Sequence, residues 1–454
     1  MLSRARVAVA PAYLLLCLVL GGSAQGVWQN MILQLAGVAI IAWAASDRSD
    51  DPLARPATQL LLLAAAFLVI VVLQLVPLPA SVWSHLGPRQ AIAGGYRVLG
   101  IAVPSEPLSV APASTLDALL KFIPPLAIFC AMVRLRAYRP GWLALALIGG
   151  TVAAVALGAL QVASSGGEPS GWYLYEDTNP GAAVGFFANR DHMGTLLIAA
   201  IPFLAALVAA ARTASMQRYS AVVAIAVGIG FVLVVGIALN SSLAGYGLAL
   251  PVVAASLLLI LPPASRLRLW VVLAAAALMV GAVIALETTA IGSGAIGMHA
   301  SSAVDSRSDL LSTSLKAAAD YMPFGSGFGT FQSVFPLYEQ AQRVNSVYVV
   351  HAHNDYAELV VELGLAGVLL IAAFLLWWIA TVARTWRTAE SSPFARAAAI
   401  ASAAMLVHSF VDFPLRTAAM AACFGMCMAF LADSRAAPPK ERKSLRRKRH
   451  VEFK

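Results

Sequence analysis

The sequence predicts an all-α polytopic membrane protein with about twelve membrane-spanning helices. Hydrophobic residues make up 60% of the 454-residue chain and charged residues only 12%, and the mean hydropathy is +0.79. A typical soluble domain has about 25% charged residues, so this composition excludes a soluble globular protein. The apolar runs are continuous and long enough to cross a hydrocarbon core of about 30 Å, whereas a membrane β-barrel would alternate apolar and polar residues.

Hydropathy along the chain places the helices within residues 1–433, which we interpret as a single transmembrane domain. The first run is basic and then apolar, as in a signal peptide, but no small-residue cleavage site with a polar region follows, so we expect this helix to be retained. The predicted helices cover residues 8–24, 27–45, 58–77, 115–133, 141–163, 188–211, 219–239, 244–262, 269–288, 356–383, 396–412 and 417–433.

Basic residues predict the orientation. Most of the 31 Lys and Arg residues fall in alternate connections and in the basic tail, residues 434–454. Because basic residues gather on the cytoplasmic side, both termini are expected in the cytoplasm. The net charge of +9 also raises nucleic-acid binding as an alternative, but a basic cluster beside a membrane helix typically holds topology and contacts anionic lipid. We therefore expect membrane lipid, and no nucleic acid, as a partner.

The four cysteines predict neither a disulfide nor a metal site. Cys17, Cys130, Cys423 and Cys427 all lie in predicted membrane helices, and the sequence has no CxxC motif and no Cys/His metal spacing. Cysteine chemistry is therefore not expected to contribute to function.

Two connections on the outer side are long. The first, about 78–114, is proline-rich with scattered aromatic residues, which suits a short helix lying at the membrane surface. The second, 289–354, is polar, contains the glycine-rich stretch 323–329, and leads directly into the helix 356–383, the tenth of the predicted helices. We expect this large loop to form the catalytic or binding face, because function concentrates on loops that a rigid scaffold positions.

The most informative stretch is 351–367, His-Ala-His-Asn-Asp-Tyr-Ala-Glu-Leu-Val-Val-Glu-Leu-Gly-Leu-Ala-Gly. Asp355 and Glu358 have capping-box spacing, which predicts a helix start near Asn354 or Asp355. His353 then lies at the helix end, where an imidazole can accept a proton near neutral pH, and His351 is the second candidate. The alternative is a set of interfacial polar residues, with Glu358 and Glu362 on a solvated or helix-packed face.

Four arginines at outer helix ends or in the outer loop form a second candidate site. The positive-inside rule disfavours arginine there, so each one favours an anionic partner such as a phosphate. The alternative for each is an ion pair with an aspartate close in sequence. The arginines are Arg190, which follows Asn189, then Arg307, Arg343 and Arg416, and the nearby acids are Asp191, Asp305, Asp309 and Asp412.

These residues resemble the O-antigen ligase and polymerase superfamily. The resemblance rests on the spacing His-x-His-Asn-x-x-x-Glu-Leu-x-x-Glu-x-Gly-x-x-Gly, on the preceding Pro-Phe-Gly-Ser-Gly-Phe-Gly-Thr-Phe (323–331), and on the following Val-His-Ser-Phe-Val-Asp-Phe-Pro-Leu-Arg (407–416). It extends over most of the chain and is best over 185–416, which includes the Asn-Arg segment. Leu75-Val-Pro-Leu-Pro-Ala-Ser-Val-Trp83 is similar as well.

The resemblance implies a bacterial inner-membrane glycosyltransferase of the GT-C-like class with its site on the periplasmic face. Other lipid-linked transferases of this class use an acidic group on an early outer loop, and the first such loop here, near residues 21–26, contains no Asp or Glu. We therefore expect no metal, and no cofactor is expected either. The implied donor is a glycan on undecaprenyl diphosphate. The acceptor is lipid A-core for a ligase, another repeat for a polymerase, or a protein hydroxyl for an oligosaccharyltransferase. His353 and His351 would be catalytic, and arginines would hold the diphosphate. Of the four outer arginines, the resemblance assigns Arg190 and Arg307 to the diphosphate. Arg343 and Arg416 are further candidates for donor binding, and the expected supporting residues are Asn354, Glu358, Glu362, Asn189 and Asp412.

One position departs from the family. Members often carry a Ser-Arg pair where this chain has Ser242 and Leu243, so one cationic contact is missing or is supplied by another residue. A proton-coupled transporter or flippase of lipid-linked glycan is the alternative from another class. Transporters place ionisable groups near the bilayer midplane and show internal repeats. Here the polar groups concentrate at one face and no repeat is found, which favours chemistry at a surface.

Overall fold

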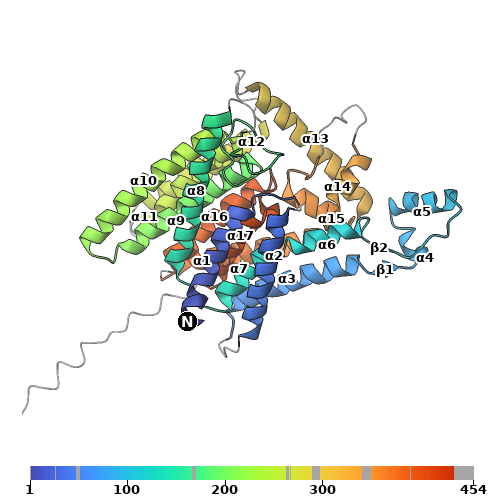
Figure 1. Ribbon diagram of the computed structural model, residues 1–454, viewed down its shortest axis with the longest axis horizontal. Helices are drawn as coiled ribbons and strands as arrows, with labels where there is room; N and C mark the ends of the chain where they lie inside the picture. The colour runs from blue at the N-terminus through green and yellow to red at the C-terminus, as the bar shows by residue number, and fades with distance from the viewer. Residues whose placement is uncertain are drawn as a thin grey trace, which may run out of the picture.

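The computed structural model is an all-α membrane bundle, as predicted (Figure 1). It describes residues 2–25, 27–47, 52–136, 138–165, 170–261, 265, 267–288, 297–339, 349–388 and 390–433. Within these ranges, eight helical segments are long and apolar enough to cross a membrane, and four shorter apolar helices accompany them. Each coincides with one of the twelve predicted helices. The spanning segments are α2 (Trp28–Ser46), α3 (Arg55–Gln74), α6 with α7 (Pro112–Leu120, Ile123–Val133), α8 (Pro140–Ser165), α9 (Arg190–Ala211), α10 (Met216–Asn240), α11 (Leu243–Ile260) and α15 (Asp355–Arg387), and the shorter ones lie in α1 (Leu2–Leu20), α12 (Leu267–Thr288), α16 (Pro393–His408) and α17 (Ala418–Ala432).

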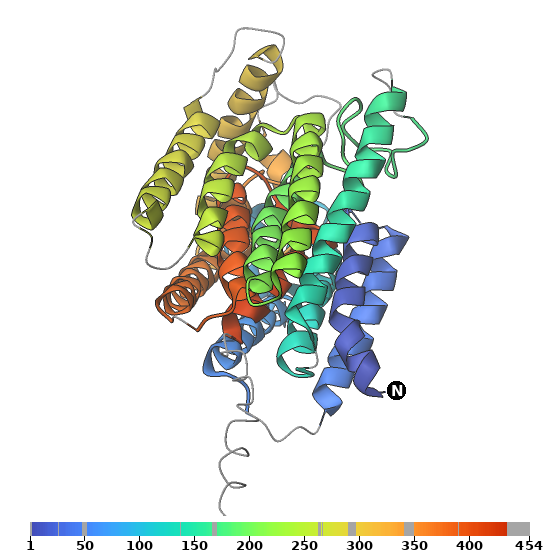
Figure 2. The same ribbon diagram turned by 90° about the vertical axis from the view of Figure 1, so that its left-hand side faces the viewer.

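Helix α9 forms the centre of the bundle. In its most apolar stretch 72% of residues are buried, compared with 11% in α10, which faces outward. Buried alanines line α16 and α17, and small residues let membrane helices approach closely. In Figures 1 and 2 these orange-red helices lie between the blue N-terminal helices and the yellow-green α10–α12. The ends of α9, α15 and α16 are thereby brought together.

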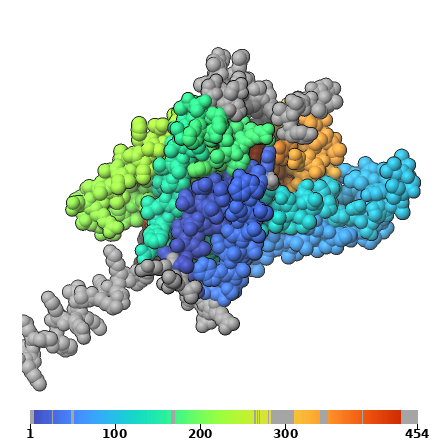
Figure 3. Space-filling view, in the orientation of Figure 1, coloured from blue at the N-terminus to red at the C-terminus, as the bar shows by residue number. Residues whose placement is uncertain are grey.

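An arm between α3 and α6 projects from the bundle, on the right in Figures 1 and 3. It contains β1 (Pro77–Leu78) paired antiparallel with β2 (Glu106–Pro107), and the short helices α4 (Ala80–Trp83) and α5 (Arg89–Val98). Arg89 ties the arm to the bundle by donating to the carbonyl of Gly325 over 2.7 Å. The arm has two short helices where one was predicted, and their position at a membrane surface stays a prediction.

The connection 289–354 was predicted as one large outer loop, and most of its described part is helical. Helix α13 (Gly297–Tyr321) is followed by α14 (Phe331–Val334) and the 3₁₀ helix η1 (Phe335–Leu337), while 289–296 and 340–348 lie outside the described residues. Ser314, Ala317 and Tyr321 recur at helical spacing, and the latter two pack against Phe331 and Phe335. A hydropathy scan misses such a helix because only one of its faces is apolar.

The glycine-rich stretch 323–329 packs into a kink in α15. Gly364 has φ +59°, and a Cβ there would lie 2.3 Å from the carbonyl oxygen of Pro323. The stretch also pairs with the kinked helix, because Ser326 N donates to Val361 O and Leu365 N to Pro323 O, each over 2.9 Å. A kinked helix leaves backbone groups without intrahelical partners, and this stretch satisfies them. The direction of the first turns of α15 is therefore fixed.

Candidate functional site

The site is built on the start of α15. The helix begins at Asp355, as predicted, but Asn354 is the cap: its Oδ1 accepts from the backbone N–H groups of Tyr356 (3.1 Å) and Ala357 (3.0 Å). The predicted capping box was therefore wrong. Glu358 instead turns back, and its carboxylate accepts from Ala352 N over 2.9 Å and lies 2.8 Å from His351 Nδ1. Because Glu358 is buried, its carboxylate needs hydrogen-bond donors, and His351 and Ala352 are donors within reach.

Both motif histidines pack against one aromatic ring. The Phe413 ring centroid lies 4.4 Å from that of His351 and 5.0 Å from that of His353. His353 has φ +51°, a left-handed conformation that non-glycine residues seldom adopt, and its Nδ1 lies 3.1 Å from His351 O. Strained backbone persists only where its surroundings fix it, and such residues cluster at functional sites.

The segment 407–416 docks on the start of α15, so two motifs far apart in sequence form one site. Asp355 N donates to Ser409 O over 2.9 Å, and Ser409 Oγ donates to Asp355 Oδ2 over 2.8 Å. Asn354 Nδ2 donates to Phe410 O over 3.0 Å. These bonds hold Phe413 beside the histidines and place Arg416 over the first turns of α15.

Arg416 lies among three carboxylates of α15: its guanidinium is 3.3 Å from Asp355, 3.3 Å from Glu358 and 3.4 Å from Glu362. Burial lowers the pKa of Arg416, but the three carboxylates outweigh burial and raise it, so the side chain stays cationic. Glu358 and Glu362 are buried rather than solvated. The predicted ion-pair partner, Asp412, is not among the three. With its charge already paired, Arg416 is poorly placed to bind a diphosphate, and we revise its role from donor binding to organising these carboxylates.

A third histidine, His192, reaches the same aromatic ring from α9. Its ring centroid is 5.0 Å from that of Phe413, and its Nε2 is 3.6 Å from Asp412 Oδ2, with both side chains buried. His192 was not among the predicted site residues, because in the segment Asn-Arg-Asp-His only the arginine suggested a ligand. Asp412, predicted as a supporting residue, thus connects α9 with the segment that carries Phe413.

Arg190 begins α9, directly after its cap Asn189, whose Oδ1 accepts from Asp191 N over 2.8 Å. Asp191, the expected ion-pair partner, instead accepts from Ser242 Oγ over 2.5 Å. In the part of the chain that the structure describes, no carboxylate forms an ion pair with the Arg190 guanidinium. Arg190 therefore remains a candidate for an anionic ligand at the N-terminus of a helix, which itself favours anions.

The other two predicted arginines are not placed at the site. Arg307 lies on α13, where only the backbone is described, and Arg343 lies outside the described residues. Leu243, where the resemblance predicts an arginine, is the first residue of α11 and directly follows Ser242, the partner of Asp191. The cationic side chain that the resemblance predicts would therefore lie close to Arg190, and this chain has a leucine at that position.

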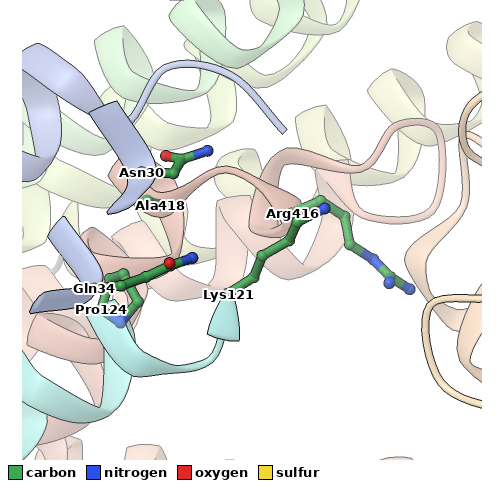
Figure 4. A pocket seen from close by; sticks show the side chains of 6 residues that line it. All are labelled: Asn30, Gln34, Lys121, Pro124, Arg416 and Ala418. Carbon is green, nitrogen blue, oxygen red and sulfur yellow. The ribbon is translucent and has the colours of Figure 1, made fainter. Parts of the chain in front are cut away.

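A cavity of about 810 Å³ opens beside the site. One end is polar and is formed by His351, Asp355, Glu358, Glu362 and Arg416; the rest is lined mainly by apolar side chains of α3, α7, α15 and α17. Arg416 also borders a much smaller pocket, about 10 Å³, together with Asn30, Gln34 and Lys121. Figure 4 shows the guanidinium pointing away from these three residues.

Comparison with known families adds one match. Residues 203–372 match the family model described as O-Antigen ligase. The matched part runs from within α9 to the middle of α15, so it includes both motif histidines, Glu358 and Glu362, but ends before Arg416. No curated protein matches the chain significantly.

Proposed function

Because residues 203–372 place the chain in the O-antigen ligase family, we propose that it transfers a glycan from undecaprenyl diphosphate to an acceptor hydroxyl. In this proposal the reaction occurs at the periplasmic face of the bacterial inner membrane, and the acceptor is lipid A-core. An O-antigen or exopolysaccharide polymerase and a protein O-oligosaccharyltransferase use the same chemistry with other acceptors. The observation that carries the proposal is the packing of His351 and His353 on Phe413, between α9 and a large cavity.

In this proposal the histidine acts on the acceptor hydroxyl and the arginines act on the donor diphosphate. The acceptor oxygen attacks the anomeric carbon of the donor, and the bond from that carbon to the diphosphate oxygen breaks. His353 accepts the acceptor's proton, and the leaving electron pair stays on the diphosphate. Arg190 stabilises that developing charge from the N-terminus of α9, joined in this proposal by Arg307 and Arg343. Charge stabilisation where charge develops is the largest expected contribution to catalysis.

Supporting residues hold the histidines. Glu358 orients His351 through the 2.8 Å contact with Nδ1, and Asn354 caps the helix directly after His353. Asn189 caps the helix that presents Arg190, and Asp412 contacts His192 behind Phe413. The arginine cations supply the phosphate charge neutralisation, so the proposed reaction needs no metal. We also propose that residues 1–433 form one transmembrane domain with both termini in the cytoplasm.

A gel of surface glycolipids tests the proposal. A strain without the gene, with and without a plasmid copy, is also probed for glycan on undecaprenyl diphosphate. Bare core with long glycan accumulating on the carrier identifies a ligase, whereas core bearing a single repeat identifies a polymerase. An unchanged pattern of both core and carrier contradicts lipid A-core as acceptor.

A further inference from the structure

Two buried glutamines lie near the ends of membrane helices, one beside each half of the site. Gln74 is the last residue of α3 and is 3% exposed, and Gln161, in the last turns of α8, is 0% exposed. Among the described residues, each of their side-chain hydrogen bonds joins a backbone group of another segment. A primary amide has two donor hydrogens and an accepting oxygen, so one side chain can hold several backbone groups at once. Such groups cannot move away without leaving a buried polar atom unpaired.

Gln74 joins the glycine-rich stretch 323–329 to α15. Its Nε2 donates to Glu362 O over 2.9 Å and to Phe324 O over 3.2 Å, and its Oε1 accepts from Phe328 N over 3.0 Å. Glu362 lies just before the kink in α15. The amide therefore fixes both the kink and the glycine-rich stretch to the end of α3.

Phe328 connects Gln74 with the carboxylates beside the histidines. The guanidinium carbon of Arg416 lies 5.7 Å from the centroid of the Phe328 ring, which favours the cation there. Arg416 in turn is 3.3 Å from Glu358, whose carboxylate lies 2.8 Å from His351 Nδ1. Because Glu358 also binds the backbone between the two motif histidines, a shift of the glycine-rich stretch changes the placement of both.

Gln161 holds the segment that leads into Arg190. Its Oε1 accepts from Val184 N over 3.1 Å and from Gly185 N over 2.9 Å, and its Nε2 donates to Gly185 O over 2.9 Å and to Trp172 O over 3.1 Å. Both backbone groups of Gly185 are thus bound by one side chain, which fixes the chain shortly before α9 begins. None of these bonds involves α15 or the glycine-rich stretch.

We propose that Gln74 and Gln161 are positioning residues, Gln74 for the histidines that act on the acceptor hydroxyl and Gln161 for the arginine that binds the donor diphosphate. This assignment rests on the proposed glycosyl transfer. Neither side chain contacts a substrate, since all their partners are backbone groups. Loss of the Gln74 amide slows the chemical step, whereas loss of the Gln161 amide weakens donor binding.

Methionine gives a matched test, because it is close to glutamine in length and lacks the amide's donors and oxygen. Gln74→Met and Gln161→Met are compared as full chains in proteoliposomes that are supplied with undecaprenyl-diphosphate glycan and rough lipopolysaccharide. Gln90→Met is the control, because Gln90 is exposed on the arm and its side chain donates only to His85 O, over 3.3 Å. Rates are expressed per folded protein.

Gln74→Met is expected to lower kcat about tenfold or more and to leave the donor KM unchanged. Gln161→Met is expected to raise the donor KM severalfold, and Gln90→Met to match the unmodified protein. A merely structural role lowers the amount of folded protein and moves neither constant. That result, or the same kinetic change in both variants, would overturn the proposal. If a methionine variant does not fold, glutamate at the same position, which keeps the length and an accepting oxygen, is expected to give the same division.

Two measurements without turnover separate this proposal from the proposed function. Equilibrium binding of undecaprenyl diphosphate is expected to weaken severalfold in Gln161→Met and to stay unchanged in Gln74→Met. Modification of His351 and His353 by diethyl pyrocarbonate, followed by mass spectrometry, is expected to change severalfold in rate in Gln74→Met and to stay unchanged in Gln161→Met. If the unmodified protein transfers no glycan, the proposed function fails and these measurements still decide the positioning roles. Equal binding, or equal modification, in the two variants would contradict them.

Discussion

His351 Nδ1 lies 2.8 Å from Glu358 Oε1, and Arg416 approaches the same carboxylate oxygen to 3.3 Å. A carboxylate at Nδ1 favours the tautomer that carries its proton there, so Nε2 of His351 is left as the acceptor. Because Glu358 also accepts from Ala352 N, the backbone before His353 is tied to the first turn of α15. One buried carboxylate thus orients one histidine and positions the next.

Glu358→Gln should therefore lower kcat about 10²-fold, since general acid–base catalysis contributes on the order of 10²–10⁴-fold and depends on orientation. The KM values should change little, because no substrate contact is removed. Steady-state kinetics with both substrates checks this. A variant with normal kcat would show that the 2.8 Å contact has no catalytic role.

Arg416→Gln should be destabilising by about 3–5 kcal/mol, because it leaves buried carboxylates without their counter-charge. The matched control is Arg190→Ala, which breaks no ion pair among the described residues and should leave stability unchanged while raising the donor KM. Thermal unfolding in detergent measures both. Equal destabilisation by the two variants would contradict the assignment of Arg416 to the carboxylates.

The difference in stability between Arg416→Gln and Arg190→Ala should persist from pH 6 to pH 9. The pKa of Arg416 is raised, against burial, by the three carboxylates. A raised pKa gives a contribution to stability that is fully present below the ordinary arginine pKa, which is far above this range, and is lost only above the still higher folded value. Repeating the unfolding comparison across this range tests the prediction, and a difference that disappears by pH 9 would be evidence against it.

Leu243→Arg should lower the donor KM severalfold. It restores a guanidinium one residue after Ser242, which bonds Asp191 beside Arg190, and a second cation near a diphosphate strengthens its binding. Leu243→Gln adds polarity without charge and serves as the control. If both variants bind the donor as the unmodified protein does, the diphosphate is not held at the N-terminus of α9.

Gly364→Ala should destabilise the protein by roughly 2 kcal/mol or more and reduce activity, because the new Cβ meets Pro323 O in a strained backbone conformation. Gly228→Ala on α10 has open space around it and should be neutral. Unfolding temperatures and transfer rates of the two variants decide this. A normal Gly364→Ala variant would show that the stretch 323–329 can shift away from α15.

The membrane helices were predictable because a continuous apolar run has one stable form in a bilayer. The start of α15 was predicted from the capping-box spacing of Asp355 and Glu358, but the hydrogen bonds of Glu358 could not be predicted. Glu358 has better donors in His351 and Ala352, which only the fold brings near. The local sequence pattern was enough to predict where α15 begins, whereas tertiary contacts determine which hydrogen bonds Glu358 forms.

The ion-pair partners of Arg416 and the role of His192 could not be predicted for a related reason. Sequence proximity suggested Asp412 for Arg416, but the docking of 407–416 on α15 supplies three nearer carboxylates. His192 looked like a residue of the arginine segment, and its contact with Phe413 joins elements more than 200 positions apart.

In the proposed mechanism His353 takes part in glycosyl transfer, and transfer by purified His353→Ala in proteoliposomes tests this role. His85→Ala, an exposed histidine on the arm, is the control. We expect kcat to fall at least 10²-fold for His353→Ala and to stay normal for His85→Ala, with both proteins folded and inserted. Near-normal transfer by a folded His353→Ala variant would contradict it.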